Sequence, residues 1–335
     1  MTTKLLEIEN LNVHFHTPEG VARAVDGVSF HLDAGETIGL VGESGCGKSV
    51  TSLSILGLIP SPPGEIQSGK IKFGGHNLLD FKAERLRKIR GHEISMIFQE
   101  PMTSLNPVLP IGRQVAEPLM IHQGLSKAEA LKKATRWLDH VKIPAAAKRL
   151  NDYPHQLSGG MRQRVMIAMA MVCGPKLLIA DEPTTALDVT IQAQILSLMN
   201  RLKEELTMSL LLITHDLGVV AQMAARVVVM YAGQVVEEAS VNEIFDHPFH
   251  PYTQGLLKSM PRIADGFNEG KQRLSEIPGI VPVLTEIIEG CKFADRCPHA
   301  FEVCRQTQPQ LLPVGQDHQA RCWLKEYPER RRSDV

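Results

Sequence analysis

The sequence predicts an α/β fold, and three observations support this prediction. A glycine-rich loop at residues 42–49 lies between a short apolar run, Thr37–Val41, and an apolar stretch of helical length. Further short runs rich in Val, Ile and Leu, such as residues 209–214, alternate along the chain with stretches of helical periodicity. Ahead of the loop, residues 5–15 and 24–32 indicate antiparallel strands, because apolar and polar side chains partly alternate there.

Length and composition place this 335-residue chain among ordinary globular proteins of about two domains. Its net charge of −1 gives no overall attraction for nucleic acid, so no nucleic-acid partner is expected. No apolar run approaches the ~18–20 residues that span a bilayer, and the first residues show no secretory signal. We therefore expect a cytoplasmic protein whose six cysteines are thiols or metal ligands rather than disulfides.

The antiparallel strands at residues 5–15 and 24–32 can cover the base of a bound nucleotide. Phe15 is the candidate for stacking on that base, since an aromatic face contributes about 0.5–1.5 kcal/mol beyond its buried area. A place in the apolar core explains Phe15 equally well. His14 or His16 could also occupy the stacking position.

The loop at residues 42–49 has the pattern G-x-x-x-x-G-K-S, which is typical of a phosphate-binding loop when it joins a strand to a helix. Glycines allow several backbone N–H groups to point into one concavity, and the following helix adds the positive end of its dipole. The lysine places a cation on the β- and γ-phosphates, and the serine hydroxyl can ligate Mg²⁺. The predicted nucleotide-binding residues are Gly42, Ser44, Gly45, Cys46, Gly47, Lys48 and Ser49, of which Ser49 is also a predicted Mg²⁺ ligand.

Polar side chains at the ends of predicted strands are candidates for catalysis. Gln99 follows the strand at residues 94–98, and its amide oxygen can reach Mg²⁺ and an attacking water. Asp181 and Glu182 close another apolar strand and face opposite ways, so one can bind Mg²⁺ through water while the other acts as general base. His215 ends a further strand and can hydrogen-bond a γ-phosphate. Taken alone, Gln99 could be a surface glutamine, the Asp181–Glu182 pair a solvated acidic turn, and His215 a structural residue.

A mostly helical insertion is predicted from about residue 102 to residue 151. Several prolines interrupt its start, and an amphipathic helix follows at residues 126–141. Ser126 and Glu129 have the spacing of a capping box at the start of this helix.

A second anion site is predicted at the start of the helix that covers residues 162–173. Ser158 can cap this helix, while Gly159 and Gly160 leave their backbone amides bare. A glycine-capped core helix is the alternative. The chain thus has two phosphate-binding helix starts, one at Lys48 and one at Ser158.

The C-terminal part of the chain changes composition after Ile244 and is predicted to be rich in loops. Before it, residues 226–238 read as a hairpin with its turn at Ala232 and Gly233. Four cysteines in the C-terminal part have the spacing C-x5-C-x6-C-x17-C, which is compatible with an iron–sulfur cluster. Zinc or no metal at all are the alternatives, since the close pairs typical of zinc are lacking. These cysteines are Cys291, Cys297, Cys304 and Cys322.

Taken in order, these motifs resemble the ATP-binding subunit of an ABC transporter over roughly residues 5–245. The resemblance implies an ATP site with Mg²⁺ held by Ser49, Gln99 and Asp181. One departure is Met161, where the family usually has Gln. The implied roles are Walker A for residues 42–49, the Q-loop for Gln99, the signature motif for residues 157–161, Walker B for Asp181 with Glu182 as catalytic residue, the D-loop for residues 186–188 including Asp188, and the switch histidine for His215.

Residues 250–257 and the Cys297–Pro298 region resemble the C-terminal extension of the oligopeptide/dipeptide/nickel branch of bacterial importers, closest to the dipeptide permease ATPases. The resemblance implies a RecA-like P-loop NTPase core with an antiparallel β subdomain, a helical subdomain and a loop-rich C-terminal extension. The expected division is an ATP-binding domain at 1–245, with the helical subdomain inserted at about 100–172, and the extension at 246–335. A [4Fe–4S] cluster on the four cysteines is also implied.

The same resemblance implies the partners and the process. Two ATPase subunits pair head to tail, so that the signature motif of one closes on the ATP of a related but different partner. Two membrane-spanning permeases and a periplasmic binding protein complete a dipeptide importer, with this chain at the cytoplasmic face of the inner membrane. An oligopeptide or nickel importer is the first alternative. A non-transport ABC ATPase is a weaker one, because the chain has neither a long coiled-coil insertion nor a second ATP cassette.

Overall fold

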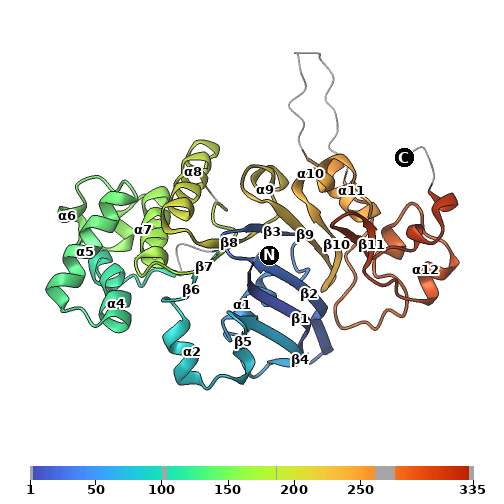
Figure 1. Ribbon diagram of the computed structural model, residues 1–335, viewed down its shortest axis with the longest axis horizontal. Helices are drawn as coiled ribbons and strands as arrows, with labels where there is room; N and C mark the ends of the chain where they lie inside the picture. Colours follow the sequence, from blue (N-terminus) through green and yellow to red (C-terminus); the bar gives the residue numbers. More distant parts are fainter. Residues whose placement is uncertain (1–2, 100–103, 186, 261–275, 332–335) are drawn as a thin grey trace, which may run out of the picture.

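The computed structural model describes residues 3–99, 104–185, 187–260 and 276–331. It is an α/β protein built on two sheets, which confirms the predicted fold class. Figure 1 shows a large central sheet with a helical lobe at one end and the C-terminal region at the other. The N-terminal strands form a separate sheet on one side of the centre.

The N-terminal sheet is antiparallel and has four strands in the order β2-β1-β4-β5. Apolar side chains such as Leu6 and Ile8 are buried between this sheet and the central one, so one face packs on the core, as is usual for antiparallel sheets. The two predicted strands ahead of the glycine loop are confirmed. The strands are β1 (Lys4–Thr17), β2 (Gly20–Asp33), β4 (Gly64–Phe73) and β5 (His76–Asn77).

The central sheet has eight strands in the order β11-β12-β10-β9-β3-β8-β7-β6. Five of them, from β9 to β6, are parallel, and their side chains are almost all buried, because helices and the other sheet cover both faces. The carboxyl ends of parallel strands meet at one edge, where the loops of the candidate site lie. The strands are β3 (Thr37–Val41), β6 (Ile94–Ile97), β7 (Leu177–Asp181), β8 (Ser209–Thr214), β9 (Arg226–Tyr231), β10 (Gln234–Ser240), β11 (Leu312–Gly315) and β12 (His318–Ala320).

The helices include those predicted from the sequence, namely α1, α5, α7 and α8, whereas the other described α-helices were not predicted individually. The capping box at the start of α5 is confirmed, since Ser126 Oγ accepts from the Glu129 amide at 3.4 Å and Glu129 Oε2 from the Ser126 amide at 3.0 Å. The α-helices are α1 (Lys48–Ile55), α2 (Ala83–Ile89), α4 (Ile111–Gln123), α5 (Lys127–His140), α6 (Ala146–Arg149), α7 (Gly159–Met171), α8 (Val189–Leu206), α9 (Leu217–Met223), α10 (Val241–Asp246), α11 (Pro251–Lys258) and α12 (Glu302–Gln306). Short 3₁₀ turns lie at Leu78–Asp80, Pro154–Gln156, Ala294–Arg296, Trp323–Lys325 and Pro328–Arg330.

Among the residues that the structure describes, no helix combines the length and the apolar character needed to cross a membrane.

The C-terminal region has more regular structure than the sequence indicated. Its strand β12 pairs with β10 and so extends the central sheet. The carboxylate of Glu237 on β10 is fully buried and joins three segments: Oε1 lies 2.7 Å from Nε2 of His318 and accepts from the Phe249 amide at 2.6 Å, and Oε2 accepts from the His250 amide at 3.0 Å. A buried carboxylate needs such partners, so Glu237 fixes the C-terminal region to the sheet.

Replacing Glu237 should therefore destabilise the whole protein. In Glu237→Leu the amides of Phe249 and His250 lose their buried acceptor, and we expect a loss of about 3–5 kcal/mol in the free energy of unfolding. Urea denaturation followed by tryptophan fluorescence measures it. The matched control is Glu84→Leu, at an exposed position of α2, which should change little. Equal stability of the two variants would contradict this role of Glu237.

Candidate active site

The glycine loop joins β3 to α1, and the backbone packed beneath it restricts its conformation. A Cβ atom at Gly42, where φ is +151°, would lie 2.2 Å from the carbonyl oxygen of Met230. At Gly47, where φ is +100°, it would lie 2.3 Å from the carbonyl oxygen of Ala24. Only glycine fits these two positions. No side chain caps α1 at Gly47, so the amides at the start of this helix are available to an anion.

Lys48 is buried at the centre of this loop. Its Nζ donates to the carbonyl oxygens of Gly42 at 2.8 Å and Glu43 at 2.9 Å, so the loop itself fixes the ammonium group. Cys46 is buried too, and burial raises the pKa of its thiol, which makes it a small neutral packing group. Ser44 and Gly45 are exposed at the open side of the loop. The loop thus offers phosphate groups a fixed ammonium group together with the uncapped amides at the start of α1.

Asp181 lies at the end of β7 and is almost completely buried. Burial raises the pKa of its carboxyl group, although a hydrogen bond from the Ser49 side chain opposes this shift. Its Oδ1 atom has no hydrogen-bond partner among the described residues. A carboxylate oxygen without a partner beside a serine hydroxyl is a donor set that fits Mg²⁺, which prefers oxygen ligands.

The side chain of Glu182, which follows β7, contacts residues that follow two neighbouring strands, β6 and β8. Its Oε2 atom accepts from Nε2 of Gln99 at 3.0 Å and from the hydroxyl of Thr185 at 2.9 Å. Its Oε1 atom lies 3.1 Å from Nδ1 of His215. The structure thus brings together Gln99, Glu182 and His215, which the sequence placed on separate strands. Thr185 was missed as a site residue, because a threonine in a turn carries no signal of its partner.

The Glu182 carboxyl group is held ionised. Burial by itself would raise its pKa, but the hydrogen bonds from His215 and Thr185 outweigh burial, and the pKa lies below its usual value. The backbone of Glu182 has a φ of +47°, a strained value for a residue with a side chain. Its amide donates to the carbonyl oxygen of Ile213 at 2.8 Å, which fixes this conformation. An ionised, rigidly held carboxylate can accept a proton.

The second predicted anion site lies elsewhere in the molecule. Ser158 caps α7, since its hydroxyl accepts from the Met161 amide at 3.4 Å. This helix packs against β6, α4, α5 and α8, whereas α1 packs against β2 and β7. Figure 1 shows α7 in the helical lobe and α1 near the centre. The structure therefore does not bring Ser158, Gly159 and Gly160 to the phosphate loop of their own chain.

Two other predicted site residues have clear structural partners. Asp188 caps α8, because its Oδ1 accepts from the Ile191 amide at 2.9 Å. Phe15 is half-buried on β1 and packs beside the core under the N-terminal sheet, so its stacking role stays a prediction. Ala186, the first residue of the expected D-loop, lies outside the described residues. The same is true of residues 100–103, which follow Gln99.

Taken together, a glycine cradle with a buried lysine, a carboxylate–serine pair that fits Mg²⁺, and an ionised glutamate define a P-loop nucleoside triphosphatase. Comparison with known proteins identifies the family. The ABC transporter family matches residues 25–185, and the family described as "Oligopeptide/dipeptide transporter, C-terminal region" matches residues 236–304.

Relatives match over almost the whole chain. The "Probable peptide ABC transporter ATP-binding protein y4tR" of Sinorhizobium fredii is 54% identical over 95% of this chain and 94% of its own length. The "Oligopeptide transport ATP-binding protein AppD" of Bacillus subtilis is 54% identical over 96% and 97%. The solved dimeric ATP-binding cassette MJ0796, with bound ADP and Pi, has a TM-score of 0.63 at 30% identity and covers 70% of this chain and 98% of that one. This chain belongs to the ABC transporter family of ATP-binding proteins.

The expected [4Fe–4S] cluster was wrong. Among the described residues, which include all four C-terminal cysteines, no group of three or more His, Cys, Asp or Glu side chains is arranged to hold a metal ion. Burial raises the pKa of Cys291 to about 11 and those of Cys297 and Cys322 to about 12, which favours neutral thiols over thiolate ligands. Cys304 is buried as well. Hydrogen bonds and apolar packing stabilise the region instead.

The buried Asp181 should reduce stability in the absence of ligands. Because its pKa in the folded state is raised, the ionised carboxylate costs stability above that pKa, and the cost disappears as the pH falls through it. Asp181→Asn should therefore melt a few degrees higher than the wild type at pH 7.5, with a difference that shrinks in acid. Thermal melting without nucleotide or metal measures it, and the exposed Asp295→Asn is the control. A lower melting temperature for Asp181→Asn would contradict this interpretation.

Proposed function

We propose that this chain hydrolyses ATP to drive the import of peptides across a membrane, as one subunit of an ABC transporter. The observation that carries this proposal is the convergence of Gln99 and His215 on the ionised Glu182, directly after the buried Asp181. Family membership and the match to the oligopeptide/dipeptide C-terminal region support it.

In this proposal Glu182 is the general base. Its carboxylate takes a proton from the water that attacks the γ-phosphate, while the amide of Gln99 orients that water. His215 donates a hydrogen bond to the γ-phosphate. Lys48 and the amides of the glycine loop bind the β- and γ-phosphates and stabilise their negative charge.

Mg²⁺ accompanies ATP in such sites, and the residues present fit it. Ser49 and Asp181 would hold the ion, with the side-chain oxygen of Gln99 as a further ligand. The ion supplies positive charge to the phosphates when it is bound.

We further propose that two ATPase subunits complete each other's sites. The start of α7, Ser158–Gly160, presents bare amides away from the phosphate loop of its own chain, and a partner subunit arranged head to tail would bring its ATP there. Asp188 lies close by at the start of α8 and would face the same junction. The MJ0796 cassette is described as dimeric. We propose a related but different ATPase as the partner here.

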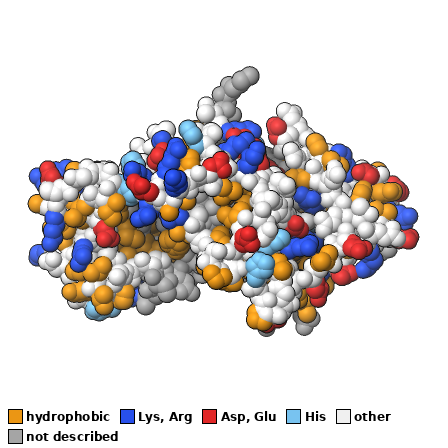
Figure 2. Space-filling model, turned by 90° about the horizontal axis from the view of Figure 1, so that it is seen from below, with side chains coloured by type: hydrophobic (Ala, Val, Ile, Leu, Met, Phe, Trp, Pro, Cys, Tyr) orange, Lys and Arg blue, Asp and Glu red, His pale blue; other side chains and the backbone are white. Residues whose placement is uncertain are grey.

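The helical lobe would contact two permease subunits at the cytoplasmic face of the inner membrane. Val108 and Ile121 are large apolar residues of this part of the chain, and they are 74% and 69% exposed. Figure 2 shows hydrophobic side chains over the helical lobe on the underside of the molecule. Exposed apolar residues gathered on one face favour a protein contact. A periplasmic binding protein would deliver the substrate to the permeases.

The transported substrate would be a dipeptide, with an oligopeptide or nickel as the alternatives. Relatives named for peptide or oligopeptide transport support a peptide. We also propose that the ATP-binding domain covers residues 1–245, with a helical subdomain at about 100–172, and that the C-terminal extension covers residues 246–335. Stimulation of ATP hydrolysis in the assembled transporter by candidate ligands would identify the substrate.

Glu182→Gln should retain ATP binding and lose hydrolysis. The amide keeps the size of the side chain but cannot accept the proton, so turnover should fall by about 10²–10⁴-fold. Nucleotide binding and phosphate release are measured on the assembled transporter. Glu205→Gln, at a half-exposed position of α8, is the matched control and should keep its activity. Turnover of Glu182→Gln near the wild-type rate would exclude Glu182 as the base.

Purified alone, the chain should bind MgATP but hydrolyse it slowly, because the anion site of a partner is missing. Adding the partner ATPase and the permeases should raise the turnover per subunit. The measurement is phosphate release as a function of subunit concentration. Fast turnover by a strict monomer would contradict the two-subunit site.

A further inference from the structure

Glu43 is an acidic residue of the loop that would bind the phosphates of ATP. It follows Gly42 directly, and its side chain is 27% exposed. An unpaired carboxylate so close to the phosphates would repel them, because like charges interact over several ångströms when little water lies between them. Glu43 therefore needs a cation as its partner.

That partner comes from the C-terminal region, 253 residues later in the chain. Arg296 binds both oxygens of Glu43: Nη1 donates to Oε2 at 2.7 Å and Nη2 donates to Oε1 at 2.9 Å. Such a bidentate pair fixes the geometry as well as balancing the charge. Within the phosphate loop Arg296 bonds to the side chain of Glu43, so we expect it to act on the loop through Glu43.

Arg296 is itself held rigidly. Its side chain is 5% exposed, and it also donates to the carbonyl oxygens of Pro278 at 3.1 Å and Ile277 at 3.2 Å. The guanidinium carbon lies 5.7 Å from the ring centre of Tyr231 and 5.9 Å from that of Phe293. A group held from so many sides can fix the position of the loop that it contacts.

The backbone of Glu43 has a second anchor in the same region. Its amide donates to the hydroxyl of Tyr252 at 2.8 Å, and Tyr252 is fully buried on α11. The ring of Tyr252 lies 4.7 Å from that of Tyr231 and 5.4 Å from that of Phe293, measured between centroids. Both the side chain and the amide of Glu43 are thus fixed by one aromatic cluster.

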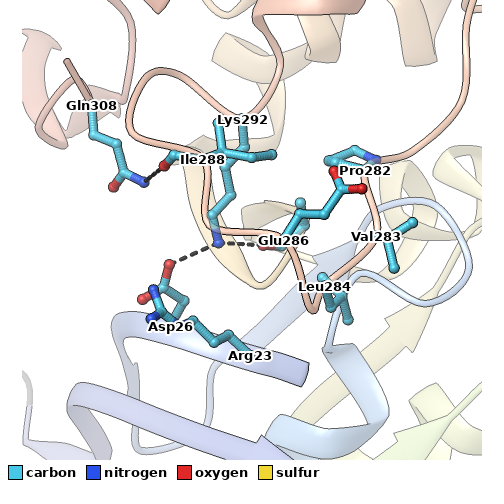
Figure 3. A pocket seen from close by; sticks show the side chains of 10 residues that line it. Arg23, Asp26, Pro282, Val283, Leu284, Glu286, Ile288, Lys292 and Gln308 are labelled. Carbon is cyan, nitrogen blue, oxygen red and sulfur yellow. Dashed lines mark hydrogen bonds and ion pairs between the residues drawn. The ribbon is translucent and has the colours of Figure 1, made fainter. Parts of the chain in front are cut away.

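A third contact supports the loop indirectly, through the turn that follows β9. Figure 3 shows Lys292 pointing from the C-terminal region toward Asp26, and its Nζ donates to Asp26 Oδ2 at 2.7 Å and to the carbonyl oxygen of Ala232 at 2.8 Å. The next residue, Gly233, donates its amide to the carbonyl oxygen of Cys46 at 3.0 Å. The C-terminal region therefore supports the phosphate loop directly at Glu43, and indirectly at Cys46 through the turn at Ala232 and Gly233.

We propose that Arg296 is a positioning residue of the ATP site: it pairs with Glu43, and so the C-terminal region completes the phosphate loop of its own chain. The proposal rests on the proposed function as an ATPase and adds to it. It assigns to the C-terminal region a role in nucleotide affinity, through an ion pair and the hydroxyl of Tyr252.

A double-mutant cycle on the full chain tests this proposal. The four proteins are the wild type, Arg296→Met, Glu43→Gln and the double variant, and the readout is the affinity for Mg²⁺ with a non-hydrolysable ATP analogue, measured by titration calorimetry. Arg296→Met should weaken binding about tenfold or more, because it leaves a carboxylate unpaired beside the phosphates. The double variant should recover most of that loss, because the carboxylate is gone as well.

Further variants separate positioning from folding. Arg296→Lys keeps the charge without the bidentate geometry and should bind with intermediate affinity. Arg305→Met removes an exposed arginine of the same region, which pairs with the exposed Asp295, and should bind as the wild type does. In assembled transporter, Arg296→Met should raise the KM for ATP more than it lowers kcat.

Two results would overturn the proposal: wild-type affinity in Arg296→Met, or a double variant as weak as Arg296→Met alone. The second result would mean that Arg296 is only structural, and a lowered melting temperature in both variants would accompany it. Failure of the proposed function has a different signature, because the wild type and every variant would then bind no nucleotide.

Discussion

The conformation of the phosphate loop depends on the backbone that is packed directly beneath it. The backbone of residues 42–49 lies directly on β2 and on the end of β9, so closely that a single added carbon at Gly42 or Gly47 would collide with a carbonyl oxygen. The amide of Gly233, in the turn that follows β9, donates to the loop. This close contact leaves little room for the loop to adopt another backbone conformation. The conformation of the loop therefore depends on β2 of the N-terminal sheet and on β9 of the central sheet.

The surroundings of two neighbouring carboxyl groups in the site shift their pKa values in opposite directions. Asp181 ends a buried strand, and burial raises its pKa, so the site favours a cation that would neutralise it. Glu182 follows directly, but hydrogen bonds from His215 and Thr185 outweigh burial and lower its pKa. A further hydrogen bond from Gln99 helps to fix its position. Asp181 is thus suited to binding a metal ion and Glu182 to accepting a proton. The positive φ of Glu182 changes the direction of the backbone between these two side chains.

Local patterns predicted most elements but not the contacts between distant parts. The strands around the loop and the capping box at Ser126 carry their signals within a few residues. The helix α4 was missed because Pro118 lies inside it, where proline normally interrupts a helix. Arg296 gives no local sign of its pairing with Glu43, since only the folded chain brings them together. Cysteine spacing misled the interpretation of the C-terminal region, because spacing alone does not show where the sulfur atoms point or whether their thiols ionise.

The long separation between Glu43 and Arg296 has a consequence for synthesis of the protein. A ribosome adds about 5–20 residues per second, so roughly ten to fifty seconds pass between the two residues. During that time the emerging chain contains the whole glycine loop without the arginine that pairs with it. The strand β12, which completes the central sheet, emerges later still. On the proposal that Arg296 positions the phosphate loop, an incomplete chain released by the ribosome would lack the partner of Glu43 and would bind nucleotide more weakly.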